Sequence, residues 1–224
     1  GDAAAMSDTR ALQPALTVVN INLWRELAGK VRPCAAAGHS LGEFSALAAA
    51  EVLDPETVLQ IVSLRGRLMA EADPDGTGSM AAILKMKQED VEALAREAAV
   101  TFDKPLKLHS PMMEKASREL EPLLRKAVWR KPQFPVYCNL HGRAVTDGES
   151  AKESLLKQMT SSVLWIETVR NQYADGVRRW VEVGPKAVLG KMVPACLNHL
   201  DEAARQELRV ELVNSLESVE NFSA

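Results

Sequence analysis

Ser40 lies at the centre of the string GHSLG, residues 38–42, and a serine between two glycines at this spacing can act as a nucleophile. Residues 33–38 are short, apolar and end in glycine, as in a strand buried on both faces, and residues 41–51 are typical of an alanine-rich helix. A strand, a turn too tight for side chains two positions either side of the serine, and a helix form, in this order, the elbow that presents a serine nucleophile. We therefore expect the turn to need both Gly38 and Gly42.

A plain helix cap is the competing interpretation of Ser40. Ser40 and Glu43 fit a capping box, in which the serine caps the helix and the glutamate reaches back. A cap needs neither Gly38 nor Gly42, however, and glycine near a helix start lowers stability. The pattern therefore favours a nucleophilic Ser40, with the Leu41 amide at the helix N-terminus as a hydrogen-bond donor to the oxyanion.

An arginine stands on the apolar side of the next expected helix, residues 55–72. Arg65 follows Ile61 by four residues and Val62 by three, so it lies in the middle of the apolar stripe. An unpaired buried charge is costly, so this guanidinium needs an anionic partner or a route to water. A structural salt bridge, a snorkelling side chain and an anionic ligand all remain open at this point.

Composition and charge are those of an ordinary globular protein. The 224 residues are 46% hydrophobic and 25% charged, with a net charge of -3 and no long basic run, which argues against nucleic acid and membranes as partners. No apolar stretch approaches the roughly 20 residues of a membrane span. Cys34, Cys138 and Cys196 are far apart, and the four histidines lack ligand spacing. We therefore expect reduced thiols, a cytoplasmic location and no metal.

Strand-like and helical segments alternate along the chain. Helices are expected over residues 13–28, 41–51, 55–72, 88–98, 111–128, 149–160 and 165–173, from about residue 186, and at the C-terminus. Strands are expected over residues 33–38, 79–86, 134–139, 178–184 and 207–214. This alternation predicts an α/β fold with a mainly parallel sheet that is covered on both faces.

Five blocks of the sequence resemble, in the same order, the malonyl-CoA:acyl carrier protein transacylases, and the resemblance extends over nearly the whole chain. The blocks are QPAL, AGHSLGEFSALAAA, LRGRLMAEADPDGTGSMAAIL, HSPMM and VEVGPKAVL. These acyltransferases load malonyl groups for fatty acid and polyketide synthesis. The resemblance implies a larger α/β-hydrolase-like subdomain and a smaller ferredoxin-like subdomain, with the active site in the cleft between them.

The same resemblance implies roles for five residues. Ser40 would be the nucleophile, His109 of HSPMM the catalytic base, and Arg65 the group that binds the malonyl carboxylate. Gln158 would hold His109 through its backbone carbonyl, and Gln13 would border the site. Gln158 lies near an expected helix end, where carbonyls lack intrahelical partners and can fix an imidazole tautomer. Because that contact uses the backbone, we expect the Gln158 side chain to matter little.

The chain departs from the family in three places. It lacks the Gly-Gln-Gly-Ser-Gln type loop that supplies the second oxyanion donor, and it lacks several tens of residues between about residues 99 and 109. Leu-Lys-Leu at 106–108 replaces a Gly-Ala-Phe-like tripeptide. We expect residues 1–86 and 110–224 to form the larger subdomain and residues 87–109 to be a remnant of the ferredoxin-like subdomain. We also expect that these 224 residues are an incomplete part of a longer protein, so that most of the ferredoxin-like subdomain is missing from them.

The implied reaction moves a malonyl group from malonyl-CoA to Ser40, and then to the phosphopantetheine thiol of an acyl carrier protein, with His109 as the base in both steps. It needs no cofactor, and we expect a monomer. A serine esterase or thioesterase, an acyltransferase domain of a polyketide synthase and a non-catalytic carrier-binding scaffold are the alternatives. An esterase would bind an apolar acyl group, whereas Arg65 favours an anionic one.

Overall fold

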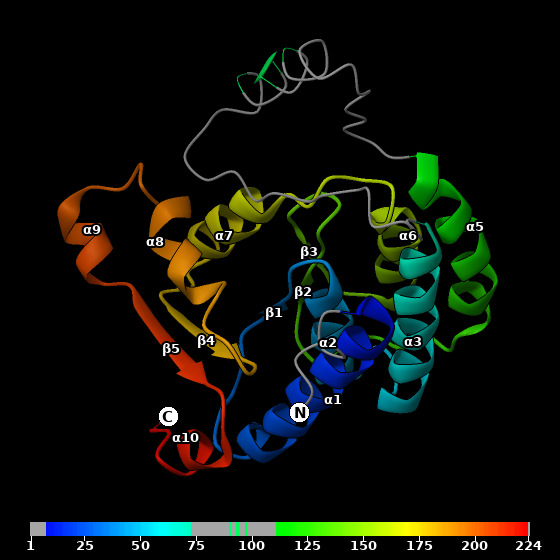
Figure 1. The fold of residues 1–224 in the computed structure, drawn as a ribbon. Helices are drawn as coiled ribbons and strands as arrows, with labels where there is room; N and C mark the ends of the chain where they lie inside the picture. The colour runs from blue at the N-terminus through cyan, green and yellow to red at the C-terminus, as the bar shows by residue number, and fades with distance from the viewer. Residues whose placement is uncertain (1–7, 73–89, 91–92, 95–96, 98–110, 224) are drawn as a thin grey trace.

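Helices surround two small sheets in the computed structural model, which describes residues 8–72, 90, 93, 94, 97 and 111–223 (Figure 1). The first part of the chain forms α1 (Thr9–Ala28), β1 (Ala36–Ala37), α2 (Leu41–Ala49) and α3 (Pro55–Ala72). The helices of the second part are α5 (Pro111–Lys126), α6 (Gly148–Gln158), α7 (Trp165–Ala174), α8 (Val193–Cys196), α9 (Glu202–Gln206) and α10 (Leu216–Glu220), with a 3-10 turn at Gly190–Met192. None of the described helices is long and apolar enough to cross a membrane.

The five described strands form two separate sheets. In the first, β1 pairs in parallel with β2 (Val136–Tyr137), and β2 pairs antiparallel with β3 (Ala144–Val145). In the second, β4 (Arg179–Val183) pairs in parallel with β5 (Arg209–Val213) over five residues. Within the described residues β1 and β4 are not hydrogen-bonded to each other, although both lie near the centre of the molecule (Figure 1).

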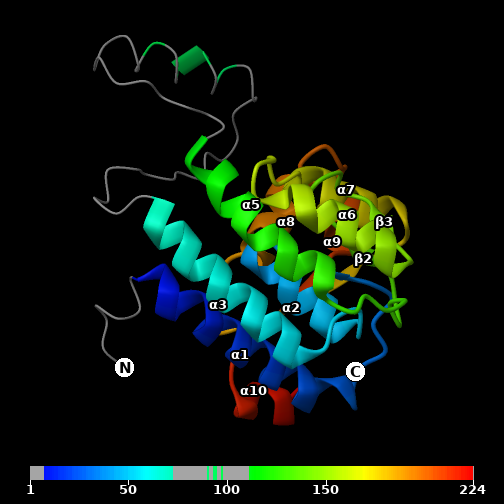
Figure 2. The same cartoon turned by 90° about the vertical axis from the view of Figure 1, so that its right-hand side faces the viewer.

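The largest core lies between the N-terminal helices and the first sheet. Phe44 and Leu47 of α2 and Ile61 of α3 are at most 1% exposed. Figure 2 shows α1, α3 and α5 side by side, and α3 contacts both of the others. Gly66 permits the close approach of α1 and α3, because a Cβ there would lie 2.6 Å from the Thr9 carbonyl oxygen. The Thr9 hydroxyl in turn donates to the Gly66 carbonyl oxygen at 2.9 Å.

The predicted alternation of strands and helices is confirmed in outline, but the single mainly parallel sheet is wrong for the described residues. Two of the three strand pairings are parallel, and the sheet divides between β1 and β4. The sequence interpretation also missed β3, which follows a turn at Gly142 with φ of 64°, and α9. The strand expected at 79–86 falls outside the described residues, and so do most residues of the helix expected at 88–98 and of the subdomain remnant expected at 87–109.

The helix expected from residue 186 begins later than predicted, after the 3-10 turn. The Glu182 carboxylate accepts hydrogen bonds from the backbone amides of Val188, Leu189 and Gly190, at 2.7 to 3.0 Å. These three bonds satisfy the amides outside a helix, so a loop forms where the sequence interpretation placed a helical start.

The tight turn after β1 depends on one glycine of the GHSLG string. A Cβ at Gly38 would lie 2.0 Å from the carbonyl carbon of Gly42 and 2.5 Å from the Glu43 nitrogen. Gly42, by contrast, has nothing within 4 Å of the position a Cβ would occupy. The expectation that the turn needs both glycines is therefore right for Gly38 and wrong for Gly42.

Replacing these two glycines by alanine should give opposite results. Gly38→Ala should lower the free energy of unfolding by about 3 kcal/mol or more, since backbone atoms would have to move to admit the methyl group. Gly42→Ala is the matched control, and it should leave stability unchanged or raise it by up to about 1 kcal/mol, as for alanine in a helix. Denaturant unfolding of both variants is the measurement. Equal losses would contradict the close contact at Gly38.

Candidate active site

Ser40 has an unusual backbone conformation at the junction between β1 and α2. Its φ of 50° and ψ of -104° lie outside the regions that side chains readily adopt, at a cost of about 1–3 kcal/mol. The Ser40 side chain makes no capping hydrogen bond to the helix. The capping box is therefore wrong, and the strained strand-to-helix turn is the geometry of a nucleophile elbow.

Asn139 holds the two sides of this turn together. Its side-chain oxygen accepts a hydrogen bond from the Ser40 backbone amide at 2.6 Å, and its amide nitrogen donates to the Gly38 carbonyl oxygen at 2.7 Å. Asn139 is fully buried and follows β2, the parallel neighbour of β1. The neighbouring strand thus offsets part of the strain at Ser40 by satisfying backbone groups that the turn leaves unpaired.

A second set of contacts holds the start of α2. The Gln158 side-chain amide donates to the Ser40 carbonyl oxygen at 3.0 Å and to the Glu43 carboxylate at 2.6 Å. The other Glu43 carboxylate oxygen accepts from the Asn139 backbone amide at 3.3 Å. Glu43 is 1% exposed, and burial raises the pKa of its carboxyl group, against the opposing effect of these hydrogen bonds. The expectation that the Gln158 side chain matters little is not consistent with these contacts.

Arg65 is buried next to Ser40. Its guanidinium donates to the Ser40 hydroxyl oxygen at 2.9 Å and to the Gln13 side-chain oxygen at 2.7 Å, and it lies over the Phe44 ring at 5.7 Å. Because the side chain is 4% exposed, the snorkelling alternative is wrong. Burial lowers the pKa of Arg65 to about 10, although the Glu43 charge acts in the opposite direction. Its Nε atom has no hydrogen-bond partner within the described residues.

The predicted site residues that the structure describes lie around one point. The side chains of Ser40, Arg65 and Gln13 are linked directly by hydrogen bonds, and the Gln158 side-chain amide donates to the Ser40 backbone carbonyl oxygen. Leu41 is the first residue of α2, where backbone amides lack intrahelical acceptors. His109 falls outside the described residues, so its role as a base and its contact with Gln158 stay predictions. The Gln158 carbonyl oxygen accepts from the Ser161 amide at 3.3 Å.

Asn139 and Glu43 are the members of this cluster whose roles the sequence interpretation missed. A signal for Asn139 was present, since it ends the expected strand 134–139. The carboxyl ends of parallel neighbours meet at one edge of a sheet, so Asn139 could have been placed beside residue 38. The pairing of β2 with β1 was not known from the sequence, and without it the neighbour could not be named.

The arrangement suits acyl transfer to an oxygen nucleophile. A serine hydroxyl stands on a strained turn at a helix N-terminus, where backbone amides can stabilise a developing oxyanion. A buried guanidinium, 2.9 Å from that hydroxyl, supplies a fixed positive charge beside it. An acyl group on Ser40 that carries its own anion close to the carbonyl would meet that charge.

Comparison with known proteins agrees with this geometry. The model of the acyl transferase domain family matches residues 1–103. The malonyl CoA-acyl carrier protein transacylase of Haemophilus influenzae is 30% identical over 265 residues, which cover 99% of this chain and 83% of that protein. The enzyme of the same name from Escherichia coli strain K12 is also 30% identical, over 92% of this chain and 81% of its own length.

Solved structures give the same result. The malonyl-CoA:ACP transacylase of Synechocystis sp. PCC 6803 superposes with a TM-score of 0.85, at 29% identity over 99% of this chain and 84% of that one. A malonyl-transacylase in complex with its type II PKS acyl-carrier protein superposes with a TM-score of 0.84, at 28% identity over 98% of this chain and 82% of that one. Sequence, fold and the arrangement around Ser40 agree, and the chain belongs to the malonyl-CoA:acyl carrier protein transacylase family.

Proposed function

We propose that this chain transfers a malonyl group from malonyl-CoA to the phosphopantetheine thiol of an acyl carrier protein, through a malonyl ester on Ser40. Its relatives from Haemophilus influenzae and Escherichia coli are named for malonyl transfer to acyl carrier protein. One similar solved structure is a malonyl-transacylase bound to its acyl-carrier protein. These likenesses support the same reaction in fatty acid biosynthesis for this chain, with no cofactor taking part.

In the first half-reaction the Ser40 hydroxyl oxygen attacks the thioester carbonyl carbon while His109 takes the hydroxyl proton. The carbon–sulfur bond then breaks, and CoA leaves as the thiol after receiving that proton. In the second half-reaction the carrier's thiol gives its proton to His109 and attacks the ester, and Ser40 regains a proton as it leaves. The Leu41 amide stabilises the oxyanion formed in each half-reaction.

The contact between Arg65 and Ser40 is the observation that carries the substrate assignment. Malonyl has a carboxylate one methylene away from the reacting carbonyl, so its anion stays close to Ser40 when the ester forms. The guanidinium that donates to the Ser40 oxygen at 2.9 Å is thus within reach of that carboxylate, together with Gln13. A planar guanidinium can hold a carboxylate through two parallel hydrogen bonds.

The same contact distinguishes malonyl transfer from the esterase alternative. An apolar acyl group on Ser40 would bury Arg65 further without offering it an anion, and that arrangement is costly. Arg65 has a buried Nε atom without a partner within the described residues, so a carboxylate would satisfy a donor that the protein leaves open. The site therefore favours an anionic acyl group over a neutral one.

Ser40→Ala should abolish the covalent intermediate. The wild-type protein, incubated with malonyl-CoA without a carrier protein, should gain the mass of one malonyl group, because no carrier thiol is present to attack the ester. Ser63→Ala, at an exposed position of α3, is the matched control and should acylate normally. Intact-mass spectrometry is the measurement. An adduct that persists in Ser40→Ala would move the nucleophile elsewhere, and a wild type that never accumulates one would favour hydrolysis or a non-catalytic scaffold.

Arg65→Ala should discriminate between two acyl groups. Loss of a buried charge-assisted contact costs roughly 2–5 kcal/mol, so malonyl transfer should fall by a factor of tens to thousands. Acetyl transfer has no carboxylate to lose and should be retained or rise. Arg65→Lys should keep more malonyl transfer than Arg65→Ala but less than the wild type, because an ammonium cannot form the bidentate pair. Arg67→Ala is the control on the same helix, since Arg67 is exposed and 3.8 Å from Glu71.

The kinetic constants for malonyl-CoA and acetyl-CoA, measured for each arginine variant, provide the test. A parallel loss for both substrates in Arg65→Ala would make Arg65 a purely structural residue and remove the basis for the malonyl assignment.

Gln158→Ala should weaken both the fold and the nucleophile. The change removes one hydrogen bond to the buried Glu43 carboxylate and one to the Ser40 carbonyl oxygen, which should lower the free energy of unfolding by about 1–3 kcal/mol. Gln172→Ala is the control, because Gln172 is a buried glutamine that bonds Trp180 instead. Both variants should lose stability, but only Gln158→Ala should acylate slowly at a temperature where both are folded. Normal acylation by folded Gln158→Ala would show that the elbow does not depend on this side chain.

A further inference from the structure

The Glu43 carboxylate is a buried titratable group beside the nucleophile, and the reaction proposed above does not use it. The Gln158 side-chain amide donates to it at 2.6 Å, the Asn139 backbone amide donates at 3.3 Å, and the Cys138 thiol is a third donor. Among the described residues its hydrogen-bond partners are thus donors. This arrangement favours the ionised form, because a protonated carboxyl group needs an acceptor for its own hydrogen.

The Cys138 thiol differs from the other two donors, because it can also act as an acceptor. A backbone amide always donates, and the Gln158 nitrogen is fixed as a donor since it also bonds the Ser40 carbonyl oxygen. A thiol can instead turn its hydrogen away and accept a hydrogen bond at sulfur. The surroundings of Glu43 can therefore accommodate a protonated carboxyl group after one small rotation.

A chain of hydrogen bonds connects Cys138 with the surface. The thiol is hydrogen-bonded to Ser154, and the Ser154 hydroxyl oxygen lies 3.1 Å from Nε2 of His141. The Arg143 backbone amide donates to the other ring nitrogen of His141 at 3.2 Å, so in the neutral ring the hydrogen is on Nε2 and points to Ser154. His141 is half-buried, so the protons of this chain can exchange with water.

Arg65 of α3 is a buried cation whose charge favours the ionised form of Glu43, whereas burial raises the pKa of that carboxyl group. Arg65 donates its own hydrogen bonds to the neutral oxygens of Ser40 and Gln13. Within the described residues, no charged group of α1 or β1 acts on Glu43. In the part of the site that the structure describes, the charges of Arg65 and Glu43 therefore balance.

A malonyl ester on Ser40 would disturb this balance, because its carboxylate adds a second anion beside one guanidinium. An uncompensated buried charge is costly, and a buried group commonly binds or releases a proton to avoid it. We propose that Glu43 takes up one proton when Ser40 becomes esterified with a malonyl group, so that Arg65 pairs with the malonyl carboxylate alone. The proton comes from water and joins a Glu43 oxygen, and the Cys138 sulfur accepts the new O–H group. The inference rests on the proposed function, since it concerns the same ester.

Proton uptake makes the malonyl ester sensitive to pH. The pKa of Glu43 is higher in the malonyl form than in the free protein, so the malonyl form binds the extra proton and is favoured as the pH falls. Between the two pKa values, the equilibrium constant for malonyl transfer from CoA to Ser40 should rise by up to about tenfold for each unit of falling pH. An acetyl group adds no charge, so its transfer should not take up this proton.

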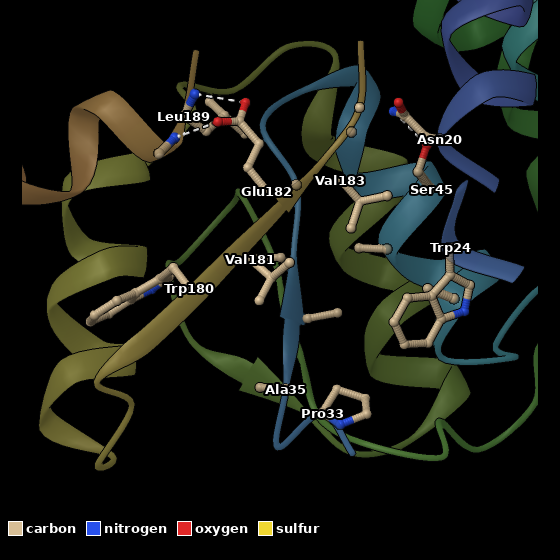
Figure 3. Close-up of a pocket in the computed structure, with 18 of the residues that line it drawn as sticks. Asn20, Trp24, Pro33, Ala35, Ser45, Trp180, Val181, Glu182, Val183 and Leu189 are labelled. Carbon is tan, nitrogen blue, oxygen red and sulfur yellow. Dashed lines mark hydrogen bonds between the residues drawn. The ribbon is translucent and has the colours of Figure 1, made fainter. Parts of the chain in front are cut away.

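Glu182 provides a matched carboxylate elsewhere in the chain. Figure 3 shows its side chain turned toward the backbone of Leu189, and it accepts from the backbone amides of Val188, Leu189 and Gly190. Glu182→Gln therefore removes a carboxylate with three hydrogen-bond donors, as Glu43→Gln does, but it leaves the anion that acts on Arg65 in place.

The test measures malonyl-Ser40 by intact-mass spectrometry at several pH values, in fixed mixtures of malonyl-CoA and CoA without a carrier protein. The ratio of acylated to free protein should rise as the pH falls in the wild type and in Glu182→Gln, and this rise should be lost in Glu43→Gln. Acetyl-CoA mixed with CoA is the substrate control, because both substrates release the same CoA thiol. Equal pH dependence in the wild type and in Glu43→Gln would overturn the proposal.

Infrared difference spectra of the wild type, before and after acylation by malonyl-CoA, provide a second readout that needs no variant. The band of a protonated carboxyl group should appear, and ¹³C-labelled malonyl-CoA should leave it in place because it belongs to the protein. A band that shifts with the label would assign the proton to the malonyl group, and pH dependence without a band would assign it to an imidazole such as His109. Either result would make the proposal wrong, whereas the absence of any malonyl adduct would contradict the proposed function itself.

Discussion

The strained backbone at Ser40 is the constraint on which the rest of the site depends. A positive φ at a non-glycine residue persists only where the surroundings determine it, and three parts of the chain do so here. Gly38 provides the space, Asn139 bonds both sides of the turn, and Gln158 bonds the Ser40 carbonyl. The buried Glu43 links the last two. The same turn that directs the hydroxyl toward Arg65 also begins α2, so fold and reactivity share one geometry.

The sequence predicted those parts of the fold that depend on local patterns. The bounds of α3 agree with the prediction because Pro55 and the apolar stripe mark them within the segment itself. The start after residue 186 was wrong because Glu182, several residues upstream, accepts bonds from three loop amides. The division into two sheets was also missed, because strand order is set by tertiary packing and not by the alternation of each strand.

The candidate site was predictable where one residue conflicts with its local pattern. Arg65 is a charged residue within an apolar stripe, and Ser40 lies between two glycines at a strand-to-helix junction. The structure brings their side chains within hydrogen-bond distance. Asn139 conflicts with nothing nearby, since an asparagine at a strand end is ordinary. The Gln158 side chain was discounted because only its carbonyl was considered, whereas its function in the fold depends on a residue 118 positions away.

The clamp around Ser40 has a consequence for the order in which the chain can acquire its reactive group. Asn139 is separated from Ser40 by 99 residues and Gln158 by 118, so local contacts alone cannot stabilise the turn. Contacts of such long sequence separation form only after a large loss of chain entropy. During synthesis from the N-terminus, the segment around Ser40 emerges well before either partner. The growing polypeptide therefore lacks a poised nucleophile until most of its length has been made, and an abandoned N-terminal fragment would be chemically inert.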